Sequence, residues 1–186
     1  MLVTNRLEWA TRAKYLTTQA KDDSVEYIHK SIGFNYRLTN LLAAMGCAQM
    51  ERLDKFVEKK REIARRYRES LKKIPGLTLP DEASWAFGTF WMYTILVNEK
   101  ETRIDSRELL RQLAVQKIQT RPLWQPMHRS VAHRYPVGTS CPIADLLHAQ
   151  ALSLPCSVGL TVSSQRLVTE TIESIVEAGK SSAGKY

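Results

Sequence analysis

The sequence has few cysteines, and they suit neither a disulfide framework nor a zinc site. Cys47, Cys141 and Cys156 are odd in number and widely separated. This spacing is typical of reduced thiols in a cytoplasmic protein. The sequence also lacks any apolar run near the ~20 residues that a membrane-spanning helix needs. Residues 1–5 are followed by charged side chains rather than by the apolar core of a signal peptide. We therefore expect a cytoplasmic protein.

The sequence has fewer acidic than basic residues. Its 19 aspartates and glutamates and 27 lysines and arginines give a formal net charge of +8. Ten basic residues lie between Arg52 and Lys73, interleaved with four acidic ones. Glu62 and Arg66 suit pairing along a helix, whereas other acidic residues at this spacing repel each other. The segment is therefore either the solvated face of a long helix or a basic, non-catalytic module that binds nucleic acid or a protein partner. Charge alone does not decide, because the sequence shows no zinc-finger spacing and no RNA-binding sheet signature.

The hydrophobic pattern of the 186 residues predicts an α+β fold. Helices are expected over residues 6–19, 39–73, 105–116, 142–151 and 161–178. Asp105 and Thr161 are the expected start signals of two of them. The buried side of the last helix is expected to carry Leu167, Ile172, Ile175 and Val176. Strands are expected over residues 2–4, 77–80, 90–97, 118–121 and 152–155. The strands would form a small antiparallel sheet covered by helices on one face. The long helix over 39–73, with a bend near Gly46 or Leu53, would bridge two bodies, and residues 179–186 would form a mobile tail.

The block over residues 33–54 carries the most information. An aromatic-rich turn offers Asn35 and Arg37, two side chains suited to an anion. Thr39 then signals a helix start. Small residues follow at Ala43, Ala44, Gly46 and Ala48. Because small residues let another backbone approach closely, we expect this helix start to lie against protein rather than water.

Four segments in order, residues 1–5, 33–54, 118–128 and 154–161, resemble the C-terminal half of the DegT/StrS family of pyridoxal-phosphate sugar aminotransferases. Within them, residues 119–128 resemble the branch that acts on nucleotide-linked 4-keto sugars, such as enzymes of perosamine and legionaminic-acid pathways. The resemblance implies the C-terminal portion of a fold-type-I aminotransferase. Residues 1–50 would then be a remnant of the large cofactor domain and an interface loop, and residues 51–178 the long helix and the small C-terminal domain.

The resemblance also implies pyridoxal phosphate as cofactor and a homodimer with shared active sites. The Schiff-base lysine of the family would lie upstream of Met1, so no catalytic residue is assigned in this chain. Lys14 and Lys21 do not follow a strand in a glycine-rich setting and are not assigned that role. The complete enzyme would transfer an amino group, from glutamate as the family does, to a nucleotide-linked keto-sugar in surface-polysaccharide biosynthesis. The chain alone is expected to be inactive.

Site residues follow from the same resemblance. Asn35 matches the position that reaches the cofactor phosphate of the neighbouring subunit; alternatively it satisfies its own turn. Tyr36 and Arg37 are candidate substrate-binding residues, although Arg37 could pair with a carboxylate at the helix start.

The second group of candidates lies over residues 118–128. Arg121, Trp124 and His128 are candidate substrate-binding residues, with a guanidinium for the diphosphate and an indole for stacking. The alternatives are a helix-capping arginine, a buried tryptophan and a histidine that caps the turn after Pro126.

Other conspicuous side chains receive no functional role. Core or edge packing is expected for Trp9, Trp85 and Trp91. No metal site is expected, and no role is assigned to His29, His133 or His148. A further alternative is that the chain is only an interaction or dimerisation domain.

Overall fold

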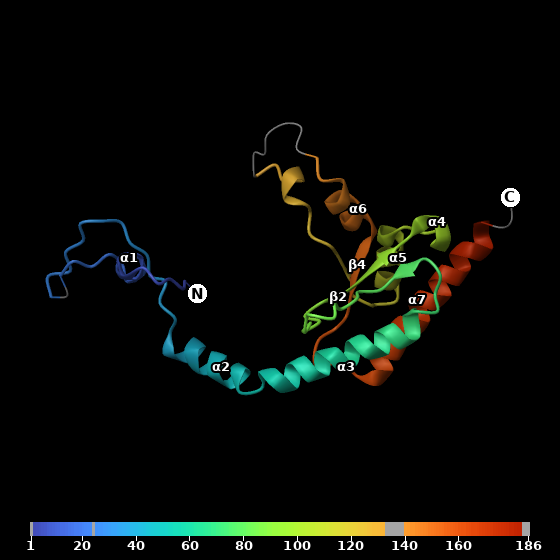
Figure 1. Cartoon of the computed structure of the whole chain (residues 1–186), viewed down its shortest axis with the longest axis horizontal. Helices are drawn as coiled ribbons and strands as arrows, with labels where there is room; N and C mark the ends of the chain where they lie inside the picture. The colour runs from blue at the N-terminus through green and yellow to red at the C-terminus, as the bar shows by residue number, and fades with distance from the viewer. Residues whose placement is uncertain (1, 24, 133–139, 184–186) are drawn as a thin grey trace. The chain divides into compact units, whose positions relative to one another are not determined.

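The computed structural model describes residues 2–23, 25–132 and 140–183 (Figure 1). The chain divides into two compact units, Met1–Arg52 and Leu53–Tyr186. No helix among the described residues is both long and apolar enough to span a membrane. His133 and the last three residues of the expected tail lie outside the described ranges.

The second unit is built on the expected antiparallel sheet. Its strands are β1 (Leu77–Thr78), β2 (Tyr93–Val97), β3 (Arg121–Pro122) and β4 (Ala151–Leu154), in the order β1-β2-β4-β3. Tyr93 pairs with Leu154 and Arg121 pairs with Ser153. Tyr93, Ile95 and Val97 of β2 are buried while the residues between them are half-buried, as side chains that alternate across a strand should be.

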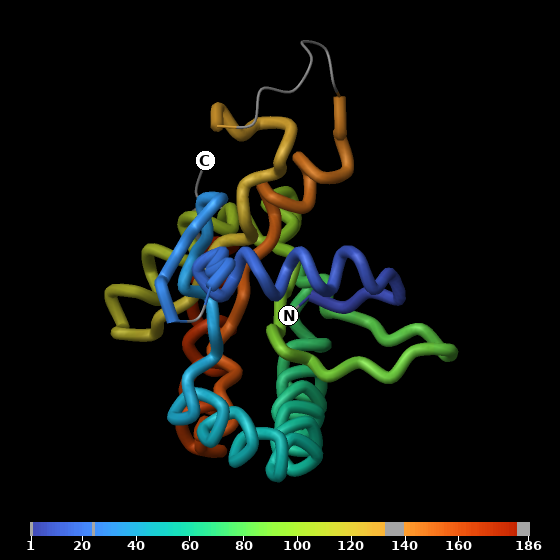
Figure 2. The backbone as a smooth tube through the Cα atoms, turned by 90° about the vertical axis from the view of Figure 1, so that its left-hand side faces the viewer, coloured from blue at the N-terminus to red at the C-terminus, as the bar shows by residue number. Residues whose placement is uncertain are grey.

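Helices cover this sheet and supply most of the core. They are α3 (Leu53–Leu71), α4 (Glu99–Thr102), α5 (Ser106–Val115), α6 (Pro142–Gln150), α7 (Val162–Ala183) and the 3-10 turn η1 (Met127–Arg129). The long helices α3 and α7 pack side by side (Figure 1). Tyr67 of α3 stacks on Tyr93 with ring centroids 5.1 Å apart, and both rings are buried. The segment between β1 and β2 runs out beside α3 and returns (green in Figure 2).

The first unit holds α1 (Leu7–Thr17), a long loop and α2 (Asn40–Met50). Two isolated bridges, Thr18 with Asn35 and Lys21 with His29, tie the loop together. Ala20 is the only buried residue among residues 2–23 and 25–52. The strand expected over residues 2–4 is wrong, because the segment is irregular and pairs with none of the residues that the structure describes.

Several boundaries differ from the prediction. The helix expected over residues 39–73 is two helices, since α2 ends at Met50 and α3 begins at Leu53. The short α4 was not predicted. Helix α7 continues to Ala183, five residues beyond its predicted end, and Gly179 within it is a packing residue rather than a stop signal. A side chain at Gly179 would come within 3.1 Å of Ile104 and of the Thr102 carbonyl oxygen.

One buried position was also misplaced. Leu167 was expected on the buried side of the last helix but is exposed, and its neighbour Val168 is buried instead. The other predicted members of that face, Ile172, Ile175 and Val176, are buried. The expected start signals are present: Asp105 accepts from the Glu108 amide at 2.6 Å, and Thr161 accepts from the Ser164 amide at 3.1 Å.

Candidate active-site surfaces

The segment that carries Asn35 is fixed by its backbone to the end of α1. The amide of Phe34 donates to the Leu16 carbonyl at 2.7 Å, and the amide of Tyr36 donates to the Thr17 carbonyl at 3.0 Å. The Gln19 amide donates back to the Phe34 carbonyl at 3.0 Å. Asn35 is therefore held between two anchored residues.

Gly33 permits this close approach. A side-chain carbon at Gly33 would lie 2.3 Å from the backbone of both Gln19 and Ala20, a distance that no side chain tolerates. Gln19 and Ala20 themselves adopt positive φ angles of 71° and 48°, which turn the chain sharply after α1. Neither the close approach at Gly33 nor its partner Ala20 was predicted from the sequence.

The aromatic side chains of this segment contact each other, whereas its polar side chains, Asn35 and Arg37, have no hydrogen-bond or ion-pair partner among the described residues. Phe34 and Tyr36 stack with centroids 5.2 Å apart, as residues two apart in an extended segment can. The exposed Asn35 side chain lies between them in sequence and has no hydrogen-bond partner among the residues that the structure describes. The alternative, a hydrogen bond between the Asn35 side chain and the backbone of its own turn, is therefore not observed. Arg37 is likewise exposed, and within the described ranges it meets no carboxylate.

Helix α2 adjoins this segment in sequence and presents an open apolar surface. It has no buried residue, although eleven residues from Asn40 to Met50 include no charged side chain. The Thr39 hydroxyl caps it, accepting from the Leu42 amide at 3.3 Å. A side chain placed at Gly46 would meet nothing within 4 Å. Among residues 2–23 and 25–52, nothing buries the small residues of α2 that were expected to lie against protein.

Arg121 and Trp124 lie at the edge of the sheet in the second unit. Arg121 opens β3 and is exposed. Trp124 follows β3 and stacks on Trp91, with centroids 6.2 Å apart and planes inclined by 14°. The alternative of a buried Trp124 is wrong, because the residue is largely exposed. For Trp9, Trp85 and Trp91, expected in the core or at an edge, the core is excluded because all three are exposed.

His128 points into a polar cluster that was not predicted. Its Nε2 lies 3.0 Å from Asp145 Oδ1, and Arg129 Nε lies 2.6 Å from the same oxygen. Burial alone would raise the pKa of Asp145, but the hydrogen bond and charge of Arg129, with a smaller contribution from His128, lower it overall. The His128 side chain is only 10% exposed, and it makes no capping bond to its own turn. No spacing rule connects His128 with a carboxylate seventeen positions away, so the pair could not be found from the sequence.

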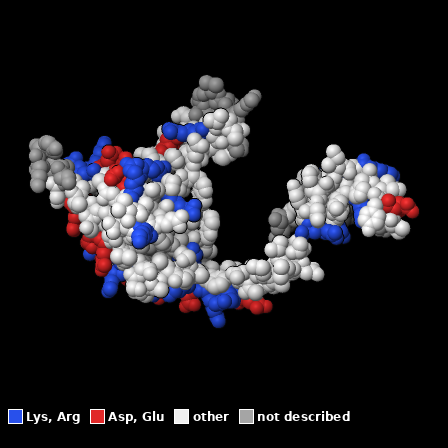
Figure 3. Space-filling view, turned by 180° about the vertical axis from the view of Figure 1, so that it is seen from behind, with Lys and Arg blue, Asp and Glu red and all other residues white. Residues whose placement is uncertain are grey.

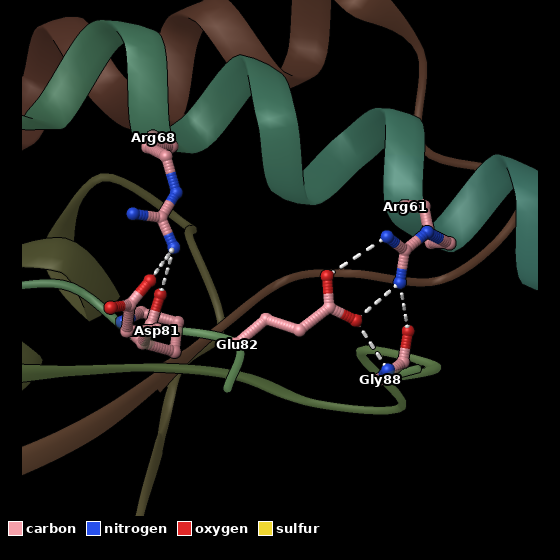
Figure 4. A network of polar contacts seen from close by, with 6 residues as sticks. Arg61, Arg68, Asp81, Glu82 and Gly88 are labelled. Carbon is pink, nitrogen blue, oxygen red and sulfur yellow. Dashed lines mark hydrogen bonds and ion pairs between the residues drawn. The ribbon is translucent and has the colours of Figure 1, made fainter. Parts of the chain in front are cut away.

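A second unpredicted cluster joins α3 to the segment between β1 and β2 (Figure 4). Arg61 donates to the two carboxylate oxygens of Glu82 at 2.7 and 2.9 Å and to the Gly88 carbonyl at 2.6 Å. Arg68 donates to the Pro80 carbonyl and lies 3.3 Å from Asp81. These bonds fix one wall of a groove beside α3, which is lined by apolar and charged side chains including Val57, Arg65, Phe87 and Phe90.

The same cluster bears on the basic-module alternative. At least five of the ten cations between Arg52 and Lys73 pair with carboxylates among the described residues: Lys59, Arg61, Arg66, Arg68 and Lys73. Figure 3 shows positive and negative side chains intermingled on the face in view rather than one broad positive patch. Much of the positive charge on this helix is therefore already paired within the chain, and the nucleic-acid alternative loses its main support. Among the described residues, no group of three potential ligands is placed to hold a metal ion.

The sequence profile of the DegT/DnrJ/EryC1/StrS aminotransferase family matches residues 1–173. The chain belongs to this family. GDP-perosamine synthase of Escherichia coli O157:H7 is 33% identical over 172 residues, which cover 92% of this chain and 46% of that protein. The chain thus spans about half the length of the curated relatives that it matches.

Two solved structures share the fold. The crystal structure of DesI, solved in the presence of its TDP-sugar product, matches with a TM-score of 0.83 at 21% identity, covering 98% of this chain and 46% of that one. Helicobacter pylori PseC, an aminotransferase of pseudoaminic-acid biosynthesis, matches with a TM-score of 0.81 at 23% identity. The match covers 95% of this chain and 48% of the PseC chain. The predicted fold, the C-terminal portion of a fold-type-I aminotransferase, is confirmed.

Proposed function

We propose that this chain is the C-terminal part of a pyridoxal-phosphate aminotransferase that transfers an amino group from glutamate to a nucleotide-linked keto-sugar for a surface polysaccharide. Family membership over residues 1–173 supports the reaction class. The name of the Escherichia coli relative, GDP-perosamine synthase, supports a nucleotide-linked sugar as substrate. We further propose that the enzyme is a cytoplasmic homodimer.

The observation that carries the proposal is the arrangement around Asn35. An amide held by anchored neighbours, exposed and without a partner among the described residues, suits donation to a phosphate oxygen without adding charge. The open apolar surface of α2, which follows directly in sequence, suits contact with a second protein surface. Together they support a loop that reaches the cofactor phosphate of a neighbouring subunit.

The residues present therefore fit a phosphate-bearing cofactor, in a supporting role. Pyridoxal phosphate supplies an electron sink for amino transfer when it is bound. In this proposal Asn35 holds its phosphate, while the Schiff-base lysine belongs to a segment before Met1 and no residue of this chain moves the proton. The 186-residue chain alone is then inactive.

The remaining candidates would hold the other substrate. Arg121 offers a planar guanidinium suited to a diphosphate, and Trp124 offers an exposed ring face. Tyr36 and Arg37 adjoin Asn35 and are proposed to contact the sugar or its phosphates. His128 is proposed to act near the sugar, held in place by Asp145.

The test compares this chain with one extended upstream to the length of its relatives. The extended protein should convert glutamate to 2-oxoglutarate in the presence of a nucleotide-linked keto-sugar, and the 186-residue chain should not. Replacing Asn35 by alanine in the extended protein should weaken cofactor binding about 10- to 100-fold, since a hydrogen bond to a charged group contributes about 1.5–3 kcal/mol. Equilibrium dialysis against pyridoxal phosphate measures this loss directly.

Asn40→Ala is the matched control, because Asn40 is another exposed asparagine five residues away, on the first turn of α2. It should leave the cofactor affinity unchanged. An extended protein that lacks transfer activity would refute the proposed reaction. Equal affinities for the Asn35→Ala and Asn40→Ala variants would refute the phosphate role alone.

A further inference from the structure

Two exposed indoles stack on each other in the second unit. Trp91 lies two residues before β2, and Trp124 lies two residues after β3. Although their planes are nearly parallel, 68% of Trp91 and 65% of Trp124 remain exposed. Single apolar residues are ordinary on protein surfaces, whereas adjoining flat rings that stay open are typical of a binding surface.

The backbone that carries Trp91 is held from two sides. Lys60 of α3 donates from Nζ to the Trp91 carbonyl at 2.8 Å, and Cys156 Sγ lies 3.5 Å from the same oxygen. Two residues later, Tyr93 is buried and paired with Leu154 in the sheet. Because the main chain is already fixed, little conformational entropy is lost when a ligand meets the indole.

We propose that Trp91 and Trp124 form one aromatic wall that packs against a flat ring face of the nucleotide-linked sugar, and that Trp91 is a specificity residue of this wall. The inference rests on the proposed function, which supplies the ligand. An indole can contact either ring of such a ligand. The nucleobase can stack on the indole, and the C–H face of the sugar ring can pack against it. Arg121, three residues before Trp124, is exposed and supplies a guanidinium for the diphosphate between those rings.

The wall lies within the second unit, so the 186-residue chain is the protein to test. Calorimetric titration would use GDP, UDP and dTDP, followed by GDP-mannose, UDP-N-acetylglucosamine and dTDP-glucose. Trp91→Ala should weaken the best-bound of these ligands about 5- to 100-fold, the range expected for loss of one aromatic stacking contact. Trp91→Phe should keep most of the affinity, because it retains a flat ring.

Trp85→Ala is the matched control. Trp85 is 89% exposed, belongs to the same unit, and lies outside the stacked pair. It should bind nucleotides as the unchanged chain does. A loss in Trp91→Ala with the free nucleoside diphosphate assigns the wall to the base, and a loss confined to the sugar nucleotide assigns it to the sugar ring.

The outcomes that overturn the inference differ from those that overturn the function. Equal affinities for Trp91→Ala and the unchanged chain would refute the wall and leave the proposed function standing. If the unchanged chain bound none of the ligands at millimolar concentration, the wall would likewise be refuted, whereas the proposed function is decided by the transfer activity of the extended protein. A changed sedimentation coefficient for Trp91→Ala with unchanged affinity would instead assign the pair to an interface between copies.

Discussion

At the scale of single residues, one carboxylate holds the segment between β1 and β2 against α3. Both oxygens of Glu82 accept from Arg61, and one of them also accepts from the Gly88 amide. Such a two-pronged guanidinium–carboxylate contact is among the stronger polar contacts in proteins. The hydrogen bond from Arg61, followed by that from Gly88, lowers the pKa of Glu82 from its ordinary 4.5 to about 2.

This shift predicts how Glu82→Gln changes the stability of the fold with pH. A carboxyl group whose pKa is lower in the folded state adds stability above its unfolded pKa and loses it as the pH falls through the folded one. The free energy of unfolding of the unchanged chain should therefore exceed that of Glu82→Gln fully at pH 7. The difference should shrink between about pH 4.5 and pH 2. Urea unfolding followed by circular dichroism at several pH values measures it.

Asp81→Asn is the control, since Asp81 is 89% exposed and makes a single 3.3 Å contact with Arg68. It should behave like the unchanged chain at every pH. A Glu82→Gln difference that stayed constant from pH 7 to pH 3 would contradict the assigned contact.

Asn35 could be singled out from the sequence because the block that carries it is continuous, and its phosphate role stays a prediction. The contacts that fix this segment, to Leu16 and Thr17, are distant in sequence and were not predicted. Arg61 and Glu82 are 21 positions apart and meet only because the chain turns back after β1. His128 and Asp145 meet across an equally unpatterned separation.

At the scale of elements, the end of α1 and the Asn35 segment depend on one glycine. Gly33→Ala would drive a methyl group into the backbone of Gln19 and Ala20, and overpacking of this kind costs about 1–3 kcal/mol. The amides of Phe34 and Tyr36, which bond to the carbonyls of α1, should then exchange with solvent about 5- to 100-fold faster. Hydrogen exchange followed by nuclear magnetic resonance measures both amides.

Gly46→Ala is the matched control for this prediction. A methyl group there meets nothing within 4 Å, and alanine favours a helix over glycine by about 1 kcal/mol. Exchange at Phe34 and Tyr36 should stay unchanged, and the amides of α2 should be better protected. Equal exchange in the two variants would show that the close approach at Gly33 does not hold the segment.

The positions of helices were predictable from the sequence where one side of the helix is buried in the core. The periodicity of α3, α5 and α7 reports contact with the sheet, so their positions were close to those observed. The strand expected over residues 2–4 failed because a strand exists only with a partner. The break between α2 and α3 was expected as a bend, yet nothing in the composition marks it as a complete interruption.

At the scale of the whole molecule, the buried apolar residues are divided very unequally. The described core runs from Ile63 to Val176 and lies entirely in the second unit. The first unit contributes one buried residue, Ala20, among those described, while most of its large apolar side chains are exposed. Ordering one residue costs about 1–2 kcal/mol of backbone entropy, so a unit with almost no core does not fold cooperatively alone.

We therefore expect a protein consisting of residues 53–186 to keep the cooperative unfolding transition of the whole chain. Its free energy of unfolding in urea should agree within about 1 kcal/mol, because the described core lies entirely within these residues. Binding of a dye for exposed apolar surface should fall, since the open helix α2 is removed. Residues 1–52 alone should unfold without a cooperative transition.

A shorter protein, residues 73–186, is the control, because it also removes the buried face of α3. That face includes Ile63, Tyr67 and Leu71, and losing even one such side chain typically costs about 2–5 kcal/mol. Its transition should disappear. If residues 53–186 also lost their transition, the first unit would have to supply stability to the second, and the surface of α2 would be occupied within the chain rather than open for a neighbouring subunit.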